Sequence, residues 1–290
     1  MSIRTLQIAC GEDFSVALDD QGYIYTTGSS EFGQLGNGET GEYFIAANKL
    51  GFANCHVFTR RTTFCHVANE NKASSSSSKD KVVPLADAAD IRIAHIACGK
   101  HHVIAVEAPS SEGTCRVFSW GCGSYGCLGR GVQQDEYFPR QISGLTSVLE
   151  HHVAQKVSAG STCSLLVTVK GHVYYWGKHK SSAEAVMRPQ LVDVLANNQH
   201  QVLYAEAGNL TVICSTAHAQ TVAWGQGGHG ELGLANKKKS SSKPTFVEAL
   251  DGVQVSGLAC GYGQTFYLVN DNKKLGTIAE ADCRDLMAGK

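Results

Sequence analysis

The sequence is poor in proline, in charged residues and in long apolar runs. Its 290 residues include only 5 prolines against 31 glycines, and 18% of them are charged, with a net charge of -1. A net charge this close to zero produces no overall electrostatic field that would attract nucleic acid or an anionic membrane, so neither is an expected partner. No stretch approaches 18 uninterrupted apolar residues and no secretion signal precedes the first strand, which predicts an intracellular protein. Many glycines beside 43% hydrophobic residues are typical of a turn-dense, soluble all-β chain.

Catalytic motifs are missing as well. The sequence has no nucleophile elbow, no P-loop and no His-Glu-x-x-His motif, so we expect no catalytic residue, no metal and no cofactor. The eleven cysteines are an odd number, which favours reduced thiols in an intracellular chain. One alternative stays open, because a hairpin turning at Thr59 to Thr62 would bring Cys55-His56 beside Cys65-His66 as a zinc site.

The sequence does contain an internal repeat. Each copy begins with a run of small apolar residues that ends in glycine, followed by a strand of alternating polarity. In the first four copies an aromatic strand comes next and ends in glycine. The residue before that last glycine is tryptophan in copies two to four. The five opening glycines are Gly11, Gly99, Gly160, Gly208 and Gly261. From the opening glycine to the glycine that ends the aromatic strand is 17 positions in three copies (11 to 28, 160 to 177, 208 to 225). Repeats of roughly 40 to 50 residues with several strands each indicate the blades of a β-propeller.

The repeat assigns roles to several residue types. A Gly-x-Leu-Gly turn follows in three copies, and we expect its leucine to fill the core while the chain reverses; these leucines are Leu35, Leu128 and Leu232. One tryptophan per repeat at an equivalent position predicts packing between blades for Trp120, Trp176 and Trp224. Cys10, Cys98 and Cys260 share a position that holds alanine in other copies, which predicts small core residues. His102 is expected to be a packed strand residue.

The spacing also predicts where the blades begin and end. We expect blades at about 3–50, 91–145, 153–195, 203–250 and 253–270, the last only a stub, followed by a tail at 271–290. The first interval is longer than the others, so we expect an inserted hairpin and a serine-rich loop at about 51–90.

Two interruptions of the repeat are candidate partner-binding sites. Residues 52–67 are interpreted as a projecting hairpin with Arg60 and Arg61 near its tip, suited to carboxylates or phosphates on a partner. The basic run after the fourth Gly-x-Leu-Gly would bind phosphate groups or an acidic tail, and it contains Lys237, Lys238, Lys239 and Lys243. The alternative in both places is a solvated loop that only keeps the surface soluble.

The repeat resembles that of the regulator-of-chromosome-condensation family, from about Ile3 to Leu268. Irregular features, such as the enlarged first interval and the glycine-poor third blade with Tyr175-Trp176-Gly177, are similar to one particular member of that family. The resemblance implies a seven-bladed propeller of which this chain would form about four blades plus a stub, resembling the carboxy-terminal portion. The basic amino-terminal tail of the family is not expected here. An open arc leaves blade edges exposed; the chain is a fragment, closes differently or is completed by another copy, and we favour the first.

The resemblance also implies function. It favours a protein–protein interaction scaffold that binds a small GTPase and chromosomal or microtubule partners in mitosis and cytoskeletal regulation, without sequence-specific nucleic-acid binding. The alternative is a guanine-nucleotide exchange factor, which needs only higher affinity for the nucleotide-free GTPase and no covalent chemistry. A third class, ubiquitin ligases bearing these repeats, needs a catalytic domain longer than the segment after Leu268. The implied localisation is nucleus and cytoplasm, with centromere, spindle or midzone in mitosis.

Overall fold

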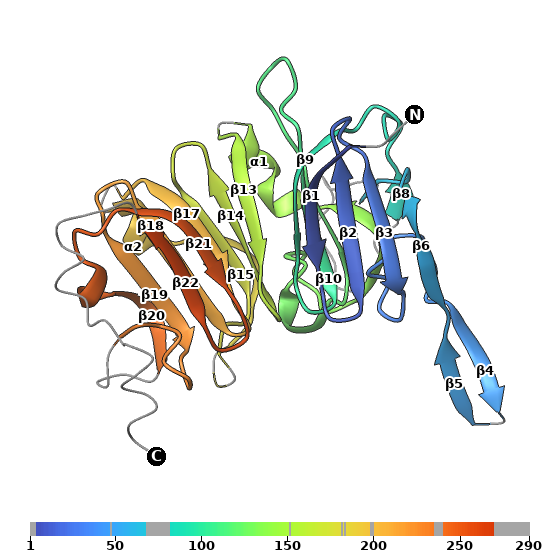
Figure 1. Ribbon diagram of the computed structural model, residues 1–290. Coiled ribbons are helices and arrows are strands. Elements are labelled where there is room, and N and C mark those ends of the chain that lie inside the picture. Colours follow the sequence, from blue (N-terminus) through green and yellow to red (C-terminus); the bar gives the residue numbers. More distant parts are fainter. Residues whose placement is uncertain are drawn as a thin grey trace.

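The computed structural model describes residues 4–46, 48–67, 82–150, 152–180, 182, 184–197, 200–234 and 240–269. These residues form small, mainly antiparallel sheets that follow one another along the chain as an open arc, from blue to red in Figure 1. This arrangement confirms the predicted all-β, partial-propeller fold. Among the described residues, no helix is long and apolar enough to span a bilayer.

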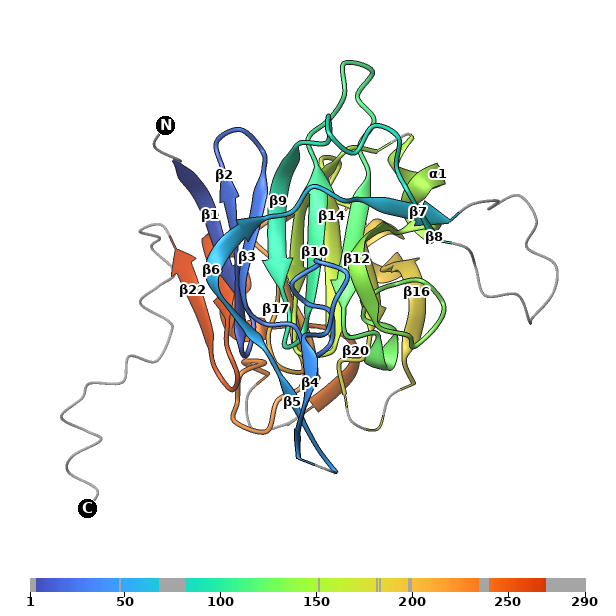
Figure 2. The same cartoon turned by 90° about the vertical axis from the view of Figure 1, so that its right-hand side faces the viewer.

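The first two sheets are the more elaborate ones. The first has the order β1-β2-β3-β6, with β1 Thr5–Cys10, β2 Phe14–Asp19, β3 Ile24–Ser29 and β6 Asn54–Arg60. The second has the order β8-β7-β12-β11-β10-β9, with β7 Cys65–Val67, β8 Val82–Pro84, β9 Ile93–Cys98, β10 His102–Glu107, β11 Val117–Gly121 and β12 Glu136–Gln141. A separate two-stranded ribbon, β4 Glu42–Ala46 and β5 Lys49–Phe52, projects away from the first sheet (Figures 1 and 2).

The remaining sheets are simpler. The third is β13 Ala154–Ala159, β14 Cys163–Thr168, β15 Val173–Gly177 and β16 Val186–Leu191. The fourth is β17 Val202–Ala207, β18 Thr211–Thr216, β19 Thr221–Gln226 and β20 Ser240–Phe246, and the fifth is the pair β21 Val255–Cys260 and β22 Thr265–Val269. The short helix η1 Ser124–Gly126 lies between β11 and β12 of the second sheet. The other short helices lie in connections between sheets: η2 Ser143–Leu145, α1 Thr146–Leu149, α2 Asp193–Asn197 and η4 Glu248–Leu250.

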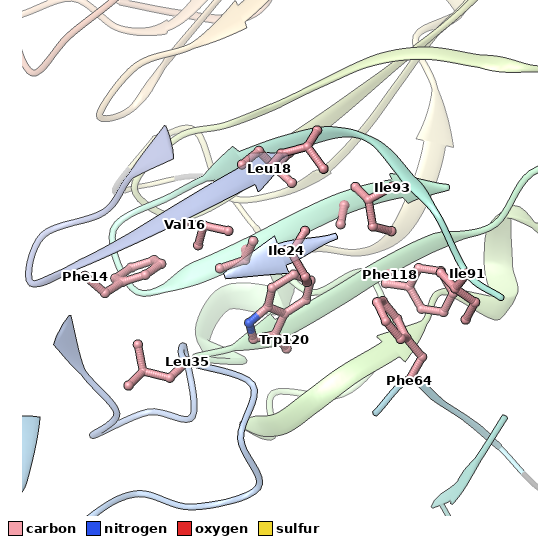
Figure 3. Close-up of a cluster of buried hydrophobic side chains, with 13 residues drawn as sticks. Phe14, Val16, Leu18, Ile24, Leu35, Phe64, Ile91, Ile93, Phe118 and Trp120 are labelled. Carbon is pink, nitrogen blue, oxygen red and sulfur yellow. The ribbon is translucent and has the colours of Figure 1, made fainter. Parts of the chain in front are cut away.

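The hydrophobic core lies at the seams between consecutive sheets. Figure 3 shows the first seam, where Trp120 and Phe118 of the second sheet pack among side chains of the first. Because side chains on a strand alternate between its faces, β10 serves two seams: Val103 packs in the first and Ile104 in the second. Strands that lie between two seams, such as β10, are therefore apolar on both faces. A strand at the outer edge of a sheet, such as β6, does not need apolar residues on both faces.

The tryptophans pack between blades, as predicted, and two of them also hold the Gly-x-Leu-Gly turn of the preceding blade. Trp120 Nε1 donates to the carbonyl of Gln34 at 3.0 Å, and Trp176 Nε1 donates to the equivalent carbonyl of Cys127 at 2.7 Å. The three turn leucines are buried, which confirms their predicted role. His102 is also buried, with Nε2 at 2.9 Å from Ser164 Oγ, and burial lowers its pKa to about 4.

The opening glycines are required where the blades meet at the axis. A Cβ placed on Gly99 would lie 2.4 Å from the carbonyl oxygen of Gly160, and one placed on Gly160 would lie 2.3 Å from that of Gly208. The same contact recurs between Gly208 and Gly261, at 2.7 Å. Backbone hydrogen bonds cross these junctions, such as Ser161 N to the Gly208 carbonyl at 3.3 Å. Only glycine permits this approach of neighbouring backbones.

The expected hairpin of the first interval is wrong, and the zinc alternative that depended on it loses its basis. Residues 52–67 do not form a hairpin: β6 pairs with β3 as the outer strand of the first sheet, and β7 joins the second sheet beside β12. Cys55 and Cys65 consequently lie on strands of different sheets, so the hairpin that would assemble zinc ligands does not form. No cluster of metal-ligating side chains occurs within the described ranges.

The shared cysteine position is also not a uniform core position. Cys10 is exposed and Cys98 and Cys260 are half-buried, because the position lies beside the axis. There the cysteines and the opening glycines line a depression of about 450 Å³. Cys10 is the most open, since no described sheet packs against the outer side of β1.

Candidate interaction surfaces

The two ends of the sheets differ in chemistry. The end that carries the opening glycines and the Gly-x-Leu-Gly turns is called here the glycine face. The end that carries the β2–β3 turn and its equivalents is the hairpin face. At the hairpin face a tight turn joins β2 to β3, with Gly22 at φ +80° and Asp19 Oδ1 accepting from Tyr23 N at 2.8 Å.

The arginines singled out in the sequence lie at the hairpin face, at the end of β6. The exposed Arg60 stacks on a tyrosine, with its Cζ 3.3 Å from the ring centroid of Tyr23. The half-buried Arg61 points back into the blade, where its Nε donates to Thr26 Oγ1 at 2.8 Å, and desolvation lowers its pKa. Only Arg60 therefore presents its charge outward, and Arg61 serves the packing of the first sheet.

The basic run is distant from these arginines. Lys243 lies exposed in β20, at the outer edge of the fourth sheet, near the opposite end of the arc from β6 (Figure 1). Lys237, Lys238 and Lys239 lie outside the described residues. The structure does not bring Lys243 together with the arginines, so the two predicted elements do not form one site.

The β4–β5 ribbon is a candidate interaction element that was not predicted from the sequence. Its strands pair in the register Tyr43↔Gly51 and Phe44↔Leu50, so Phe44 and Leu50 share one face of the ribbon. Phe44 is 77% exposed and Leu50 is 45% exposed. Tyr43 and Ile45 lie on the other face and are also exposed. The available signal was the run of β-prone apolar residues at 43–45, followed by Leu50 and Phe52.

The ribbon belongs to the glycine face. It follows the first Gly-x-Leu-Gly turn, and Ala53 N bonds to the Gly41 carbonyl at its base at 2.8 Å. Near the axis, Glu12 Oε2 lies 3.3 Å from Lys100 Nζ and 3.0 Å from His101 Nε2, which links the first two blades. Burial is the main cause of a lowered pKa at His101, whereas Glu12 opposes that shift.

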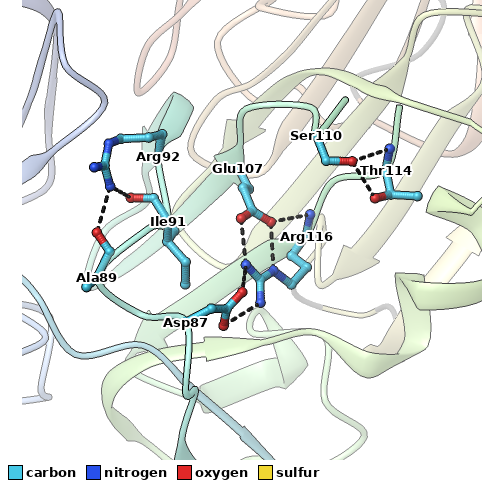
Figure 4. A network of polar contacts seen from close by, with 8 residues as sticks. All are labelled: Asp87, Ala89, Ile91, Arg92, Glu107, Ser110, Thr114 and Arg116. Atoms are coloured by element: carbon cyan, nitrogen blue, oxygen red, sulfur yellow. Dashed lines mark hydrogen bonds and ion pairs between the residues drawn. The ribbon is translucent and has the colours of Figure 1, made fainter. Parts of the chain in front are cut away.

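The hairpin face carries a groove of about 650 Å³ built around Arg116. Figure 4 shows its guanidinium between Glu107 and Asp87. Nε and Nη2 contact the two Glu107 oxygens at 2.7 and 2.6 Å, and Nη2 also lies 2.9 Å from Asp87 Oδ2. The pKa of Arg116 is raised and that of Asp87 lowered by this pairing. With two carboxylates bound to it, the Arg116 guanidinium is structural and offers no free cation to a ligand.

Comparison with known proteins supports the same architecture. The family model described as "Regulator of chromosome condensation (RCC1) repeat" matches residues 116–167 and 223–268, and a second model of the same description matches residues 6–34. Protein RCC2 of Homo sapiens is 30% identical over 271 residues, which are 92% of this chain and 48% of the relative.

Two solved structures share the fold. Human WBSCR16 has a TM-score of 0.65 at 21% identity, over 93% of this chain and 60% of the other. Prp20p of Saccharomyces cerevisiae has a TM-score of 0.62 at 17% identity, over 99% of this chain and 60% of the other. Prp20p is described as having binding properties to Gsp1p and histones.

The repeats, seams and tryptophan–turn bonds define a partial propeller of the regulator-of-chromosome-condensation type. The chain belongs to the family of proteins that carry RCC1 repeats, and its similarity to RCC2 proteins confirms the resemblance inferred from the irregular features. It spans about half the length of the curated relatives it matches.

Proposed function

We propose that this chain is a protein–protein interaction scaffold that binds a small GTPase through its glycine face. The single observation that carries the proposal is the β4–β5 ribbon, which exposes Phe44 and Leu50 as a cross-strand pair on a rigid blade. Exposed apolar groups on an element anchored in a scaffold are typical of protein interaction sites. The family relationship supports a GTPase as the partner, since Prp20p is described as having binding properties to Gsp1p.

The test measures binding of the full chain to a panel of small GTPases, each in GDP, GTP-analogue and nucleotide-free form. The double variant Phe44→Ala/Leu50→Ala should weaken binding at least about tenfold, because removing two apolar anchors costs well above 1.4 kcal/mol. A matched control is Val57→Ala/Phe58→Ala, which removes two exposed apolar side chains from β6 instead of the ribbon. Equal binding by both double variants would refute the ribbon as the contact.

A second candidate function is nucleotide exchange, which the family relationship favours. The partner face is the same, but the protein would then bind the nucleotide-free GTPase more tightly than the loaded one. Substoichiometric protein should accelerate release of a labelled nucleotide if it is an exchange factor. Tight binding without acceleration would leave the scaffold role alone.

The basic residues are proposed as contacts for a further, acidic partner, since Arg60 lies at the hairpin face, away from the ribbon. Arg60 and Lys243 expose their charges, and reversal to glutamate at either position should reduce binding of an acidic partner. Arg61 supports the first blade, and Lys237, Lys238 and Lys239 belong to the same basic run as Lys243 in the sequence. Histones or microtubules as partners, and a location in nucleus and cytoplasm with mitotic structures, rest on the family relationship. Salt-dependent cosedimentation with nucleosomes or microtubules and imaging of the tagged chain test these points.

A further inference from the structure

A pocket of about 560 Å³ opens on the glycine face and is formed by the first four blades. Phe32 follows the first blade's β3, Tyr125 follows β11, Lys178 follows β15, and Asn209 lies in the β17–β18 turn. Residues more than 170 positions apart (32 to 209) therefore meet in it. Its volume is within the usual range for small-ligand sites, about 300–1,000 Å³.

The charge in this pocket is unbalanced. No aspartate or glutamate is among the residues that line it. The half-buried Lys178 stands over the ring of Tyr125, with Nζ 5.1 Å from the centroid, and forms no ion pair with any carboxylate of the described residues. Its neighbour Lys100, by contrast, is paired with Glu12. A partly desolvated ammonium without a counter-ion favours an anionic ligand.

Uncommitted hydrogen-bond donors line the same pocket as this ammonium. Ser161 Oγ donates to Asn209 Oδ1 at 2.6 Å, which orients the amide and turns its NH₂ group away from that bond. Ser124 Oγ accepts the Cys122 thiol at 3.3 Å, so its own hydrogen is available as a donor. One ammonium and a few neutral donors suit a single negative charge, whereas a phosphate group generally recruits arginine forks or several cations.

An aromatic wall lies beside the charge. Tyr125 is held at φ +58°, an unfavourable conformation for a residue with a side chain, and the residue is 45% exposed while it lines the pocket. Phe32 occupies the equivalent position of the first repeat, and its ring lies 4.7 Å from that of His101. Two aromatic rings next to an ammonium offer a surface for a flat or apolar side chain adjoining the anion.

We propose that this pocket binds an acidic side chain, aspartate or glutamate, with a neighbouring aromatic or leucine side chain, from an extended segment of a partner protein. Lys178 pairs with the carboxylate, Asn209 and Ser124 donate to it, and Tyr125 and Phe32 contact the neighbouring side chain. The assignment goes beyond the proposed function, because the segment need not belong to a GTPase and the ribbon takes no part in it.

The experiment titrates the full chain with a panel of fluorescein-labelled, amidated pentapeptides. Each has one aspartate or glutamate beside phenylalanine, tyrosine or leucine, and each is matched by a peptide with asparagine or glutamine in its place. We expect at least one acidic peptide to bind with Kd below about 1 mM and at least about fivefold more tightly than its amide counterpart. No saturation by any peptide, or equal binding of acidic and amide forms, would overturn the proposal.

Variants locate the binding. Lys178→Ala should weaken the acidic peptide at least about fivefold and remove its preference over the amide peptide, as expected for loss of a paired charge. The matched control is Lys180→Ala, two residues away, where Nζ contacts Ser242 Oγ outside the pocket at 3.4 Å. Equal losses in both variants would overturn the assignment, as would binding only by peptides whose sole carboxylate is a free carboxyl terminus. Unchanged urea midpoints of both variants separate loss of binding from loss of folding.

Discussion

Replacement of Gly160 by alanine tests whether backbone contact at the axis holds the blades together. The added Cβ would lie 2.3 Å from the Gly208 carbonyl oxygen, 3.0 Å from Cys163 Sγ and 3.2 Å from Ala207 Cβ. The first distance requires a backbone shift, because a carbonyl oxygen cannot rotate away as a side chain does. That shift also lengthens the 3.3 Å hydrogen bond from Ser161 N to the same oxygen.

The magnitude follows from two opposing contributions. Overpacking in a close-packed site costs about 1–3 kcal/mol and a weakened hydrogen bond about 1 kcal/mol. Alanine recovers about 0.4–1 kcal/mol by restricting the unfolded chain. We therefore expect Gly160→Ala to lower the free energy of unfolding by about 2 kcal/mol. With a urea dependence of about 1–3 kcal/mol per molar, the midpoint should fall by roughly 1 M.

The assay is urea unfolding followed by tryptophan fluorescence, which reports on the seams because all three tryptophans are buried in them. Gly228→Ala is the control, since Gly228 is exposed and a Cβ there meets nothing within 4 Å. The control should keep or slightly raise its midpoint. If the midpoints of the two variants agree within about 0.2 M, axial backbone contact does not explain the repeated glycine.

Three further predictions concern the seams and the first blade. Trp176→Phe should cost about 1 kcal/mol more unfolding free energy than Trp224→Phe in urea titrations. The indole of Trp176 donates to a carbonyl of the preceding blade, whereas that of Trp224 has no such bond among the described residues. Equal costs would contradict that role. His102 has a folded-state pKa of about 4 against 6.5 ordinarily, so the unfolded chain binds the proton first and stability should fall by roughly 3 kcal/mol as the pH drops from 6.5 to 4. His102→Gln should flatten this part of the stability–pH curve, and an unchanged curve would assign the loss to other groups. Arg61→Met should lower the unfolding free energy by about 1–3 kcal/mol, because it removes a charge-assisted hydrogen bond to the buried Thr26 hydroxyl, which keeps only its own bond to the Leu35 carbonyl. Arg60→Ala should cost below about 1 kcal/mol. The reverse order in urea titrations would show that Arg61 does not support the first blade.

The parts of the fold that sequence predicts are those encoded locally and repeated. Apolar alternation in residues such as Val103 to Val106 predicts strands buried on both faces, and a tryptophan at the same position of successive copies predicts a seam. These signals need no knowledge of the partner strand. The axial glycines are similarly visible in the sequence, although their reason, the carbonyl of the next blade, appears only in three dimensions.

The predicted hairpin in the first interval was wrong because the sequence of an outer strand specifies its pairing partner less strongly than that of an inner strand. β6 is exposed at Val57 and Phe58, so neither apolar periodicity nor a turn motif distinguishes pairing with β3 from pairing with residues 61–67. β7 joins the second sheet through the single parallel pairing Arg140↔Cys65, a contact between residues 75 positions apart (65 to 140). Such pairings depend on which edge is free once the inner strands have assembled.

The pocket around Lys178 was missed for a related reason. Its lining comes from turns of four blades, so most of its key residues are far apart in sequence. In the sequence, a lysine after Trp-Gly cannot be distinguished from any solvated lysine. Only the structure shows that the residues lining its pocket include no carboxylate. The one local signal was the aromatic residue before Gly-x-Leu-Gly, present as Phe32 and Tyr125.

The two ends of the arc follow the same packing rule as its interior. In the inner copies, the side chain three residues before the opening glycine is buried against the preceding blade, as for Ile96, which is 1% exposed. In the first copy this position is Ile8, which is 64% exposed. In the inner copies, the side chain five residues after the opening glycine is buried against the following blade, as for Ile104. In the last copy this position is Phe266, which is 65% exposed. Each end therefore presents the apolar surface of a seam that lacks its second half within the described residues. The repeat places these exposed side chains at the same positions as the buried ones of every inner seam. Any surface that covers either end therefore has to be apolar, as the facing side of a blade is.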